Sequence, residues 1–298
     1  MRVGVVFRQD IRNDAPVLCY ARSYVEAFTA MGHDVFTAGE GHPKALVEEL
    51  PPVDLIVEIE NGRNEAGELR FQVPLMDRTG VETAVVLIDS HGHPDHHAAV
   101  ARGYDHVFFA VWARRDLFQG HASAHWCPNA TDWKWFGREN FTEIPKVVDF
   151  GFFGSRRGLS RADDLVEICR RRGWSYDVRE VVKSRRNRWP TTGNAMSACK
   201  ILYNKGQKHD GPNQRVMESM AMGAPLLNDI DGRSGMDKLF EQGVHYVPYD
   251  VSCLEKNMEY LMENAEDAAR IAAAGCEEVR QKHQVRNRAE QILEVISA

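Results

Sequence analysis

The residues best suited to chemistry lie close together in the stretch His209–Asp229. A polar loop there leads into a segment with apolar residues at helical spacing, which predicts a helix with one buried face. Arg215 and Glu218 lie three residues apart, so they share a face of its first turns. A helix start with a nearby arginine suits a diphosphate, and a carboxylate one turn later can accept hydrogen bonds from ribose hydroxyls. A solvated Arg–Glu ion pair on an ordinary surface helix is the alternative.

Alternating strand-like and helix-like segments surround this stretch and must position it. Gly223 is expected to end the helix, and the apolar residues after it form a short buried strand. In the second half of the chain, strands are predicted at residues 147–153, 176–182, 201–204, 225–228 and 245–248, followed by a helical tail over about 254–296. Apolar strands that alternate with helices predict a parallel sheet with helices on both faces.

The first half of the chain shows the same alternation. Strands are predicted at residues 3–7, 34–38, 54–60, 83–89 and 106–112, and helices at 15–31 and about 69–79. Ligands of parallel α/β sheets gather at the carboxyl ends of the strands. Residues 8–14, 60–68 and 89–97 are therefore the segments of this half that are expected to face a ligand.

A polar stretch interrupted by Pro145 predicts a domain boundary near the middle of the chain, with α/β domains over residues 1–145 and 146–298. The net charge of −6 is uneven along the chain. Residues 1–147 hold 14 Lys/Arg against 21 Asp/Glu, a net charge of −7, and the remaining residues hold 23 against 22, a net charge of +1. The second half is therefore the better candidate for a phosphate-bearing ligand. Neither half is basic enough to require nucleic acid as a partner.

Composition and missing motifs exclude several classes of protein. With 43% hydrophobic and 27% charged residues, the chain can bury a core and is not intrinsically disordered. The six cysteines are scattered without a CxxC pair, which favours free thiols in a reducing cytoplasm over a disulfide frame or a cysteine–zinc site. No leader pattern and no apolar run near 18 residues is present, so we expect a soluble cytoplasmic protein. The absence of GxGxxG and of a P-loop lysine argues against a dehydrogenase or a kinase.

Several motifs occur in an order that resembles a known family. They are Phe150–Ser155 followed by Arg161, Lys200–Asn204, and the segment with Asn213, Arg215, Glu218 and Ala221–Pro225. Tyr104–Phe108, Cys127–Asp132 and a closing helix with Gly275, Val279, His283 and Arg288 extend the likeness, which is good from about residue 83 onward. The chain resembles the GT-B glycosyltransferases, and most of all the CgeB-like (spore-maturation-protein-like) branch of the glycosyl transferases group 1 family. The resemblance implies two Rossmann-like parallel-sheet domains that face each other across a cleft.

The same resemblance implies an activity and a set of site residues. The C-terminal domain would bind a nucleotide-diphosphate sugar, with a UDP-sugar expected, and the sugar would pass to an unidentified acceptor without a metal or another cofactor. Glu218 would hold the ribose, and the leaving diphosphate would lie at the helix start. The predicted donor-binding residues are Gly154, Arg156, Arg161, Asn204, Asp210, Asn213, Arg215 and Glu218. Asp210 and Glu218 keep the family's spacing of two acidic residues, although Asp in the first place departs from its usual pattern.

A histidine cluster over Asp89–His97 has two interpretations. The sequence from His91 to His96 satisfies the HxHxDH pattern of metallo-β-lactamases, whose side chains bind zinc and lower the pKa of a bound water molecule. That fold needs two mixed sheets and a further histidine downstream. His121 comes too early for that role, and the chain predicts parallel sheets. A zinc hydrolase is nevertheless kept as the alternative function of another class.

In the glycosyltransferase interpretation, Asp89-Ser90-His91 resembles a family Asp-Ser/Thr-His sequence at the carboxyl end of a strand. The resemblance implies His91 as the general base for an acceptor hydroxyl, since it titrates near neutral pH, and Asp89 as the second catalytic candidate. Alternatively, His91 binds the sugar or a phosphate. A helix is expected to begin at Pro94. The remaining histidines are expected to solvate the start of this helix: His93, His96 and His97.

One basic run, Lys183–Trp189, places a tryptophan beside arginines. A solvated loop is the ordinary explanation, but such a run can also follow a phosphate backbone while the ring stacks on a base. A modified base in DNA, which some phage-type GT-B enzymes use, therefore stays among the possible acceptors. The other possible acceptors are a glycan, a protein or a small molecule, and the oligomeric state is not predicted.

Overall fold

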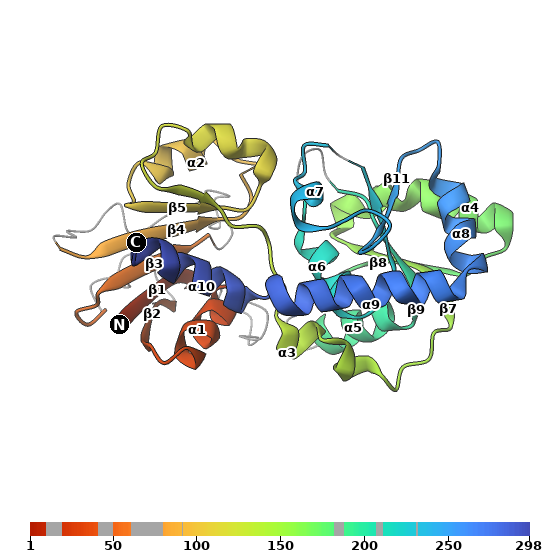
Figure 1. Ribbon diagram of the computed structural model, residues 1–298, viewed down its shortest axis with the longest axis horizontal. Helices are drawn as coiled ribbons and strands as arrows, with labels where there is room; N and C mark the ends of the chain where they lie inside the picture. The colour runs from red at the N-terminus through yellow and green to blue at the C-terminus, as the bar shows by residue number, and fades with distance from the viewer. Residues whose placement is uncertain are drawn as a thin grey trace. The chain divides into compact units, whose positions relative to one another are not determined.

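The computed structural model describes residues 1–9, 20–40, 50–60, 80–90, 92–181, 188–206, 211–230 and 232–298. The chain divides into two compact units, each built on its own parallel sheet (Figure 1). The first unit comprises residues 1–129 and 285–298, and the second comprises residues 130–284. The predicted ranges, 1–145 and 146–298, divide the chain differently at the linker and at the last helix.

The last helix, α10 (Val285–Ile296), belongs to the first unit because it packs against α1 (Tyr20–Ala30). The buried Arg288 donates from Nε to the carbonyl oxygen of Pro128 over 2.7 Å. Gln291 donates from Nε2 to the carbonyl oxygen of Trp126 over 2.9 Å. Sequence periodicity identifies a helix but not the sheet on which it packs, so these contacts were not predicted.

The first unit holds a six-stranded sheet in the order β2-β1-β3-β4-β5-β6. Its strands are β1 (Arg2–Gln9), β2 (Asp34–Glu40), β3 (Leu55–Ile59), β4 (Glu82–Leu87), β5 (His106–Phe109) and β6 (Ala124–Trp126). All neighbouring pairs are parallel, as predicted. Strand β6 was not predicted, because three half-buried residues carry no periodic signal. Helix α2 (Pro94–Ala101) and the 3₁₀ helix η3 (Trp112–Phe118) complete this unit together with α1 and α10.

The second unit holds a five-stranded sheet in the order β11-β10-β9-β7-β8, again with parallel neighbours. Its strands are β7 (Val148–Gly154), β8 (Tyr176–Glu180), β9 (Cys199–Asn204), β10 (Leu226–Asp229) and β11 (Val247–Tyr249). Its helices are α3 (Trp133–Phe136), η4 (Arg138–Phe141), η5 (Arg156–Ala162), α4 (Asp163–Arg172), α5 (Arg188–Ser197), α6 (Gln214–Ala221), α7 (Met236–Leu239), α8 (Leu254–Glu263) and α9 (Ala265–Lys282). The predicted helical tail is therefore three helices, α8, α9 and α10, separated by breaks at Asn264 and at His283.

Both sheets reverse their winding direction near the centre. In the second unit, the chain goes from β7 outward to β8, then crosses back to β9 on the other side of β7 and continues to β10 and β11. The reversal therefore lies between β7 and β9. In the first unit, the corresponding reversal lies between β1 and β3. Open α/β sheets bind ligands outside the carboxyl ends of the strands at such a point.

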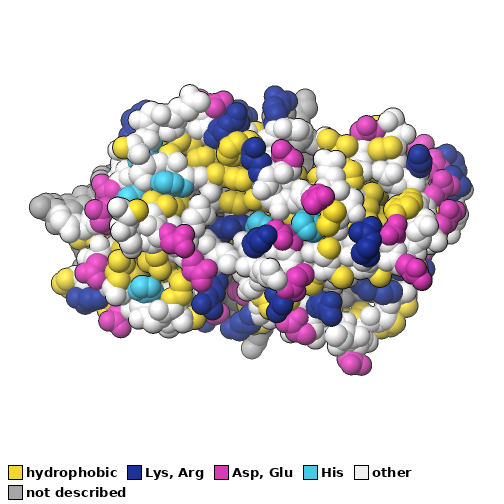
Figure 2. Space-filling model, viewed as in Figure 1, with side chains coloured by type: hydrophobic (Ala, Val, Ile, Leu, Met, Phe, Trp, Pro, Cys, Tyr) yellow, Lys and Arg dark blue, Asp and Glu magenta, His cyan; other side chains and the backbone are white. Residues whose placement is uncertain are grey.

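The surface is mixed in charge over the face that Figure 2 shows. At the end of the second unit where α4 and α8 lie, basic and acidic side chains gather together. There Glu255 accepts from Arg171 and Arg172 over 2.8 and 2.6 Å. These exposed arginines are thus engaged in ion pairs. Among the helices that the structure describes, none combines the length and the apolar character needed to span a membrane.

Candidate functional site

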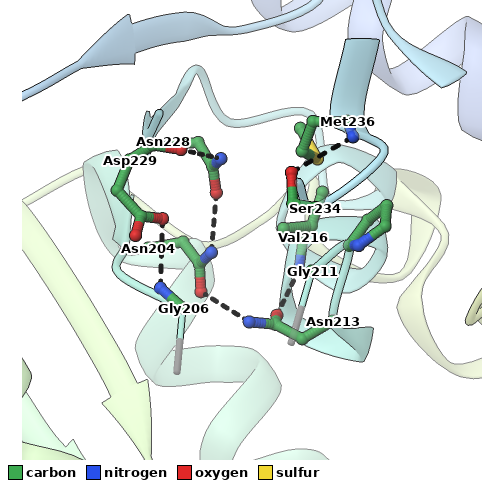
Figure 3. Close-up of a pocket in the computed structure, with 10 residues that line it drawn as sticks. Asn204, Gly206, Gly211, Asn213, Val216, Asn228, Asp229, Ser234 and Met236 are labelled. Carbon is green, nitrogen blue, oxygen red and sulfur yellow. Dashed lines mark hydrogen bonds between the residues drawn. The ribbon is translucent and has the colours of Figure 1, made fainter. Parts of the chain in front are cut away.

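A polar pocket lies at the carboxyl ends of β9 and β10, beside the start of α6 (Figure 3). Its lining comes from segments that are far apart in the sequence: Asn204, Gly206, Gly211, Pro212, Asn213, Val216, Asn228, Asp229, Ser234 and Met236. It adjoins the reversal point between β7 and β9. The structure therefore brings the predicted Asn204 and Asn213 together where the topology favours a ligand.

Asn204, the last residue of β9, is the centre of the hydrogen bonds in this pocket. Its side chain is buried, and its Nδ2 donates to Oδ1 of Asn228 over 2.6 Å (Figure 3). Its Oδ1 accepts from Nη1 of Arg215 over 2.8 Å and from Nδ2 of Asn213 over 3.4 Å. Since both ends of the amide are engaged, its orientation is fixed, and Asn204 holds Arg215 in place.

A buried tyrosine supports Asn204 from the core of the second unit. The hydroxyl of Tyr249 donates to the carbonyl oxygen of Asn204 over 3.1 Å. Burial raises the pKa of Tyr249, so its hydroxyl stays neutral and keeps its proton for this bond. The tyrosine ring stacks on that of Tyr203, with the ring centroids 5.1 Å apart. The carboxyl end of β9 is thereby anchored to the hydrophobic core.

The start of α6 follows from its sequence, as predicted. Asn213 has an extended backbone at the N-cap position, and its Oδ1 accepts from the backbone N–H of Val216 over 3.3 Å. The helix buries one face, formed by Val216, Met217, Met220 and Ala221. Gly223 follows the helix with a φ of 70°, a left-handed conformation that glycine adopts without strain. A helix N-terminus capped in this way favours an anion through its N–H groups and its dipole.

Arg215 places a guanidinium group beside the end of β7. Its Cζ lies 4.6 Å from the ring centroid of the buried Phe152, which is close enough for a cation–π contact. Gly154 makes room for this arrangement. A Cβ atom at Gly154 would lie 3.3 Å from Nη2 of Arg215 and 3.0 Å from the Phe152 ring. The glycine predicted from the motif is therefore needed for close approach.

Arg161 brings a second guanidinium group to the same ring, with its Cζ 5.8 Å from the Phe152 centroid. Its Nε donates to the carbonyl oxygen of Gly158 over 3.2 Å, and its Nη1 donates to that of Lys205 over 3.1 Å. These bonds tie the turn after β7 to the turn after β9. The two partly buried arginines can therefore offer positive charge to a diphosphate at the reversal point.

The structure gives less information on the remaining predicted donor-binding residues. Glu218 lies on α6, partly buried, and three residues beyond Arg215 as expected. Arg156 begins η5, and only its backbone belongs to the described part of the chain. Asp210 lies outside the described residues. Its role stays a prediction, as does that of Glu218 in holding a ribose.

Two site residues were missed in the sequence, Asn228 and Asp229. Asn228 Nδ2 donates to the backbone carbonyl oxygen of Asp229 over 2.8 Å, and Asp229 Oδ1 accepts from the backbone N–H of Gly206 over 3.0 Å (Figure 3). They join the ends of β9 and β10. The sequence could have identified them, because two polar residues directly after a buried strand mark the carboxyl edge of a sheet.

The predicted catalytic segment follows β4 in the first unit. Asp89 is exposed, and its backbone N–H donates to Oε2 of Glu60 over 3.0 Å. His91 lies outside the described residues, so its role as a base stays a prediction. Helix α2 begins at Pro94 with His93 in the N-cap position, as expected.

The expectation for His97 was wrong. Its side chain is fully buried instead of solvating the helix start, because it lies on the inner face of α2. Its Nδ1 lies 3.0 Å from Oγ of Ser90, and its Nε2 lies 3.4 Å from Oε1 of Glu60. Neither Glu60 nor Ser90 was singled out in the sequence. A histidine within a polar run gives no sign that it faces inward.

The metallo-β-lactamase interpretation fails on the fold. It requires two mixed sheets packed face to face, whereas both sheets here are parallel and belong to separate units. Within the described ranges, no group of three or more His, Cys, Asp or Glu side chains is arranged to hold a metal ion.

Comparison with known proteins agrees with this geometry. The model of a family described as "Glycosyl transferase-like" matches residues 138–294. No curated protein matches the chain. The predicted enzyme class, glycosyltransferase, is confirmed by the family match, whereas the CgeB-like branch stays a prediction.

Solved structures resemble the whole chain at low sequence identity. An α-glucosyltransferase in complex with UDP and a 13-mer DNA containing a HMU base has a TM-score of 0.71 at 10% identity, over 100% of both chains. Sucrose-phosphate synthase from Thermosynechococcus elongatus has a TM-score of 0.63 at 11% identity, over 99% of this chain and 98% of that chain. Anabaena HepE in complex with UDP and glucose has a TM-score of 0.59 at 13% identity, over 100% of this chain and 99% of that chain. The predicted GT-B fold is confirmed.

Proposed function

The chain belongs to the glycosyl transferase-like family, and on this basis we propose that it transfers a sugar from a nucleoside diphosphate sugar to an acceptor hydroxyl group. The donor would bind to the second unit, at the pocket around Asn204. The observation that carries this proposal is the hydrogen bond from Arg215 to the buried Asn204 at the reversal point of the sheet, beside a capped helix start. This arrangement is built to hold an anion.

The second unit supplies the groups that the leaving diphosphate requires. The acceptor oxygen forms a bond to the anomeric carbon while the bond from that carbon to the diphosphate oxygen breaks, so negative charge develops on the diphosphate. Arg161 and Arg215 would stabilise this charge, together with Arg156 and the N-terminus of α6. Because these groups supply positive charge, the proposed reaction has no obligatory metal ion or other cofactor. Glu218, one turn into α6, would accept hydrogen bonds from the ribose.

The acceptor loses a proton in the same step. In a reaction that inverts the anomeric centre, His91 would take this proton, and Asp89 would assist it from the same turn of the first unit. A reaction that retains the anomeric configuration needs no such base. The stereochemistry therefore decides whether this pair acts on the acceptor, and transfer with analysis of the product anomer would reveal it.

A uridine donor is the first choice to test. Two of the similar structures, Anabaena HepE and the α-glucosyltransferase, are complexes with UDP. This supports UDP-sugars as donors for the present chain. The same α-glucosyltransferase structure holds a DNA containing a HMU base, which supports a modified base in DNA as a second candidate acceptor. Such a base would have to leave the helical stack before transfer.

The direct test is a thermal-shift screen with UDP, GDP, ADP and TDP. A ligand at about 100 times its dissociation constant stabilises the folded state by roughly 2.7 kcal/mol, and each kcal/mol moves the midpoint by about 2–4 °C at this size. One diphosphate should raise the midpoint clearly in the wild type and not in Arg215→Ala. Arg280→Ala, which removes an exposed arginine paired with Glu277 on α9, is the matched control and should respond like the wild type. No response of the wild type to any of the four would contradict the proposal.

A further inference from the structure

A buried network of three polar side chains lies beneath the turn that follows β4. Glu60, Ser90 and His97 are 6%, 0% and 0% exposed. Oε2 of Glu60 accepts from the backbone N–H groups of Ile88 and Asp89 over 2.5 and 3.0 Å. Oε1 of Glu60 faces Nε2 of His97 at 3.4 Å, and Nδ1 of His97 lies 3.0 Å from Oγ of Ser90. The network thus holds residues 88–90 by backbone and by side chain.

The groups that face Glu60 determine the charge of its side chain. Burial alone raises the pKa of Glu60, but the hydrogen bond and charge of His97 and the two backbone N–H groups outweigh it and lower the pKa. Glu60 is therefore a carboxylate and accepts the two backbone hydrogen bonds. Nε2 of His97 faces this carboxylate at 3.4 Å. The ionised side chain of Glu60 thus contacts the backbone of the turn after β4 and His97 at once.

Stability alone gives little reason for such a group. Burying a carboxylate beside an imidazole costs desolvation energy that the pairing offsets only in part, and apolar side chains of similar size often stabilise a protein as well. What a buried charged network does provide is a single geometry. Here the fixed segment lies at the carboxyl ends of β3 and β4, the edge of the sheet where ligands gather.

A second glutamate, two residues before Glu60 on β3, provides a contrast. Glu58 is 3% exposed, and its Oε2 accepts from the hydroxyl of Tyr104 over 2.5 Å. Tyr104 follows α2 and packs in the hydrophobic core of the first unit. Glu58 therefore contacts the core side of the fold, whereas Glu60 contacts the backbone at the exposed Asp89. Both carboxylates are buried and lie close together at the end of β3, but they hold different parts of the structure in place.

We propose that Glu60 is a positioning residue for sugar transfer, acting through His97 and Ser90 to hold the backbone of residues 88–90 and thereby the carboxylate of Asp89 toward the acceptor. This inference rests on the proposed function. Glu60 touches neither donor nor acceptor. It sets the place and direction of Asp89, and a displacement of about 1 Å at a reacting group can lower a rate on the order of 100-fold.

The test uses the full-length protein and a reaction that needs no identified acceptor. The UDP-sugar that the wild type hydrolyses fastest among UDP-glucose, UDP-galactose and UDP-N-acetylglucosamine is the probe, with water as acceptor and UDP release as the readout. Glu60→Gln should lower kcat by about 10- to 100-fold with little change in the KM for the donor. His97→Ala should act likewise, and His97→Gln, whose Nε2 can still donate to Glu60, should restore part of the loss.

Glu58→Gln is the matched control, because it changes another buried carboxylate only two residues away in the chain. All variants are compared well below their unfolding midpoints, and UDP binding is measured by thermal shift in each. If Glu60→Gln and Glu58→Gln have the same kcat, the proposed positioning role of Glu60 is wrong. A wild type that binds none of UDP, GDP, ADP and TDP would instead overturn the proposed function, so the two failures are distinguishable.

Discussion

The carboxyl edges of the two sheets are built alike and charged differently. Each has one buried polar side chain that binds its neighbours through several hydrogen bonds, Asn204 in the second unit and Glu60 in the first. Asn204 is neutral and holds a guanidinium group beside a helix start, so the edge around it is positive. Glu60 is a carboxylate facing a histidine, so its edge can orient a group that takes up a proton. The centre of each network sets which kind of ligand the edge suits.

The charge of the whole chain follows the same division. Residues 1–147 carry a net charge of −7, and the rest carry +1. The proposal that a phosphate-bearing donor binds to the second half agrees with this difference in net charge. The contrast between the edges can be tested by changing one centre at a time.

The largest effect is expected from Asn204→Ala. It removes a hydrogen-bond partner of Arg215, Asn213 and Asn228; of these only Asn228 is buried, and a buried polar group that loses its partner costs about 1–3 kcal/mol. We expect a loss of unfolding free energy of about 2–3 kcal/mol and no stabilisation by UDP, measured by urea unfolding with and without the nucleotide. Hydrogen exchange at the amides of residues 88 and 89 should stay as in the wild type. Faster exchange there would show that the two edges do not act independently.

A smaller effect is expected from Gly154→Ala. The added Cβ meets the Phe152 ring at 3.0 Å and Nη2 of Arg215 at 3.3 Å, so the guanidinium group must move. UDP affinity should fall by about tenfold, or about 1.4 kcal/mol, with little change in stability. Gly120→Ala is the matched control, since nothing lies within 4 Å of its added Cβ. Equal UDP affinity in both variants, measured by calorimetry, would contradict a role for Arg215 in donor binding.

The carboxyl edge of the first sheet should show a dependence on pH that comes from Glu60. The folded protein lowers the pKa of Glu60 below its ordinary value of 4.5, so this group contributes stability above that pH and loses the contribution as the pH falls through the folded pKa. The difference in unfolding free energy between the wild type and Glu60→Gln should therefore be largest near pH 7 and shrink below pH 4.5. Urea unfolding over this range measures it, and a difference that grows on acidification would have the wrong sign.

The smallest effect is expected away from both edges. Glu255 is partly exposed and pairs with the exposed Arg171 and Arg172 between α4 and α8. Exposed ion pairs contribute little because water and salt screen them. Glu255→Gln should leave UDP binding and donor hydrolysis unchanged and hardly move the unfolding midpoint. A clear loss of UDP binding would show that charge far from Asn204 contributes to the donor site.

The sequence predicted the second edge better than the first, for a physical reason. Asn213, Arg215 and Gly223 lie within one loop, helix and turn, where residue types report local backbone needs. Glu60 and His97 meet only after two strands and a helix pack, so neither shows its partner in the sequence. The parallel sheets, the GT-B fold and the enzyme class were predictable from alternation and motifs. The pairing of Asn204 with Asn228, the short strand β6 and the packing of α10 depend on tertiary contacts.

The return of α10 to the first unit has a consequence for synthesis. The second unit, residues 130–284, is an insertion between two parts of the first, and residues 285–298 follow it in the chain. Domains generally fold as units while the chain emerges from the ribosome. The second unit can therefore fold before the first is complete, since Arg288, which donates to the carbonyl oxygen of Pro128, is synthesised after the whole second unit. The carboxyl edge around Asn204 would then form on the growing chain before the first unit, which holds the edge around Glu60, is complete.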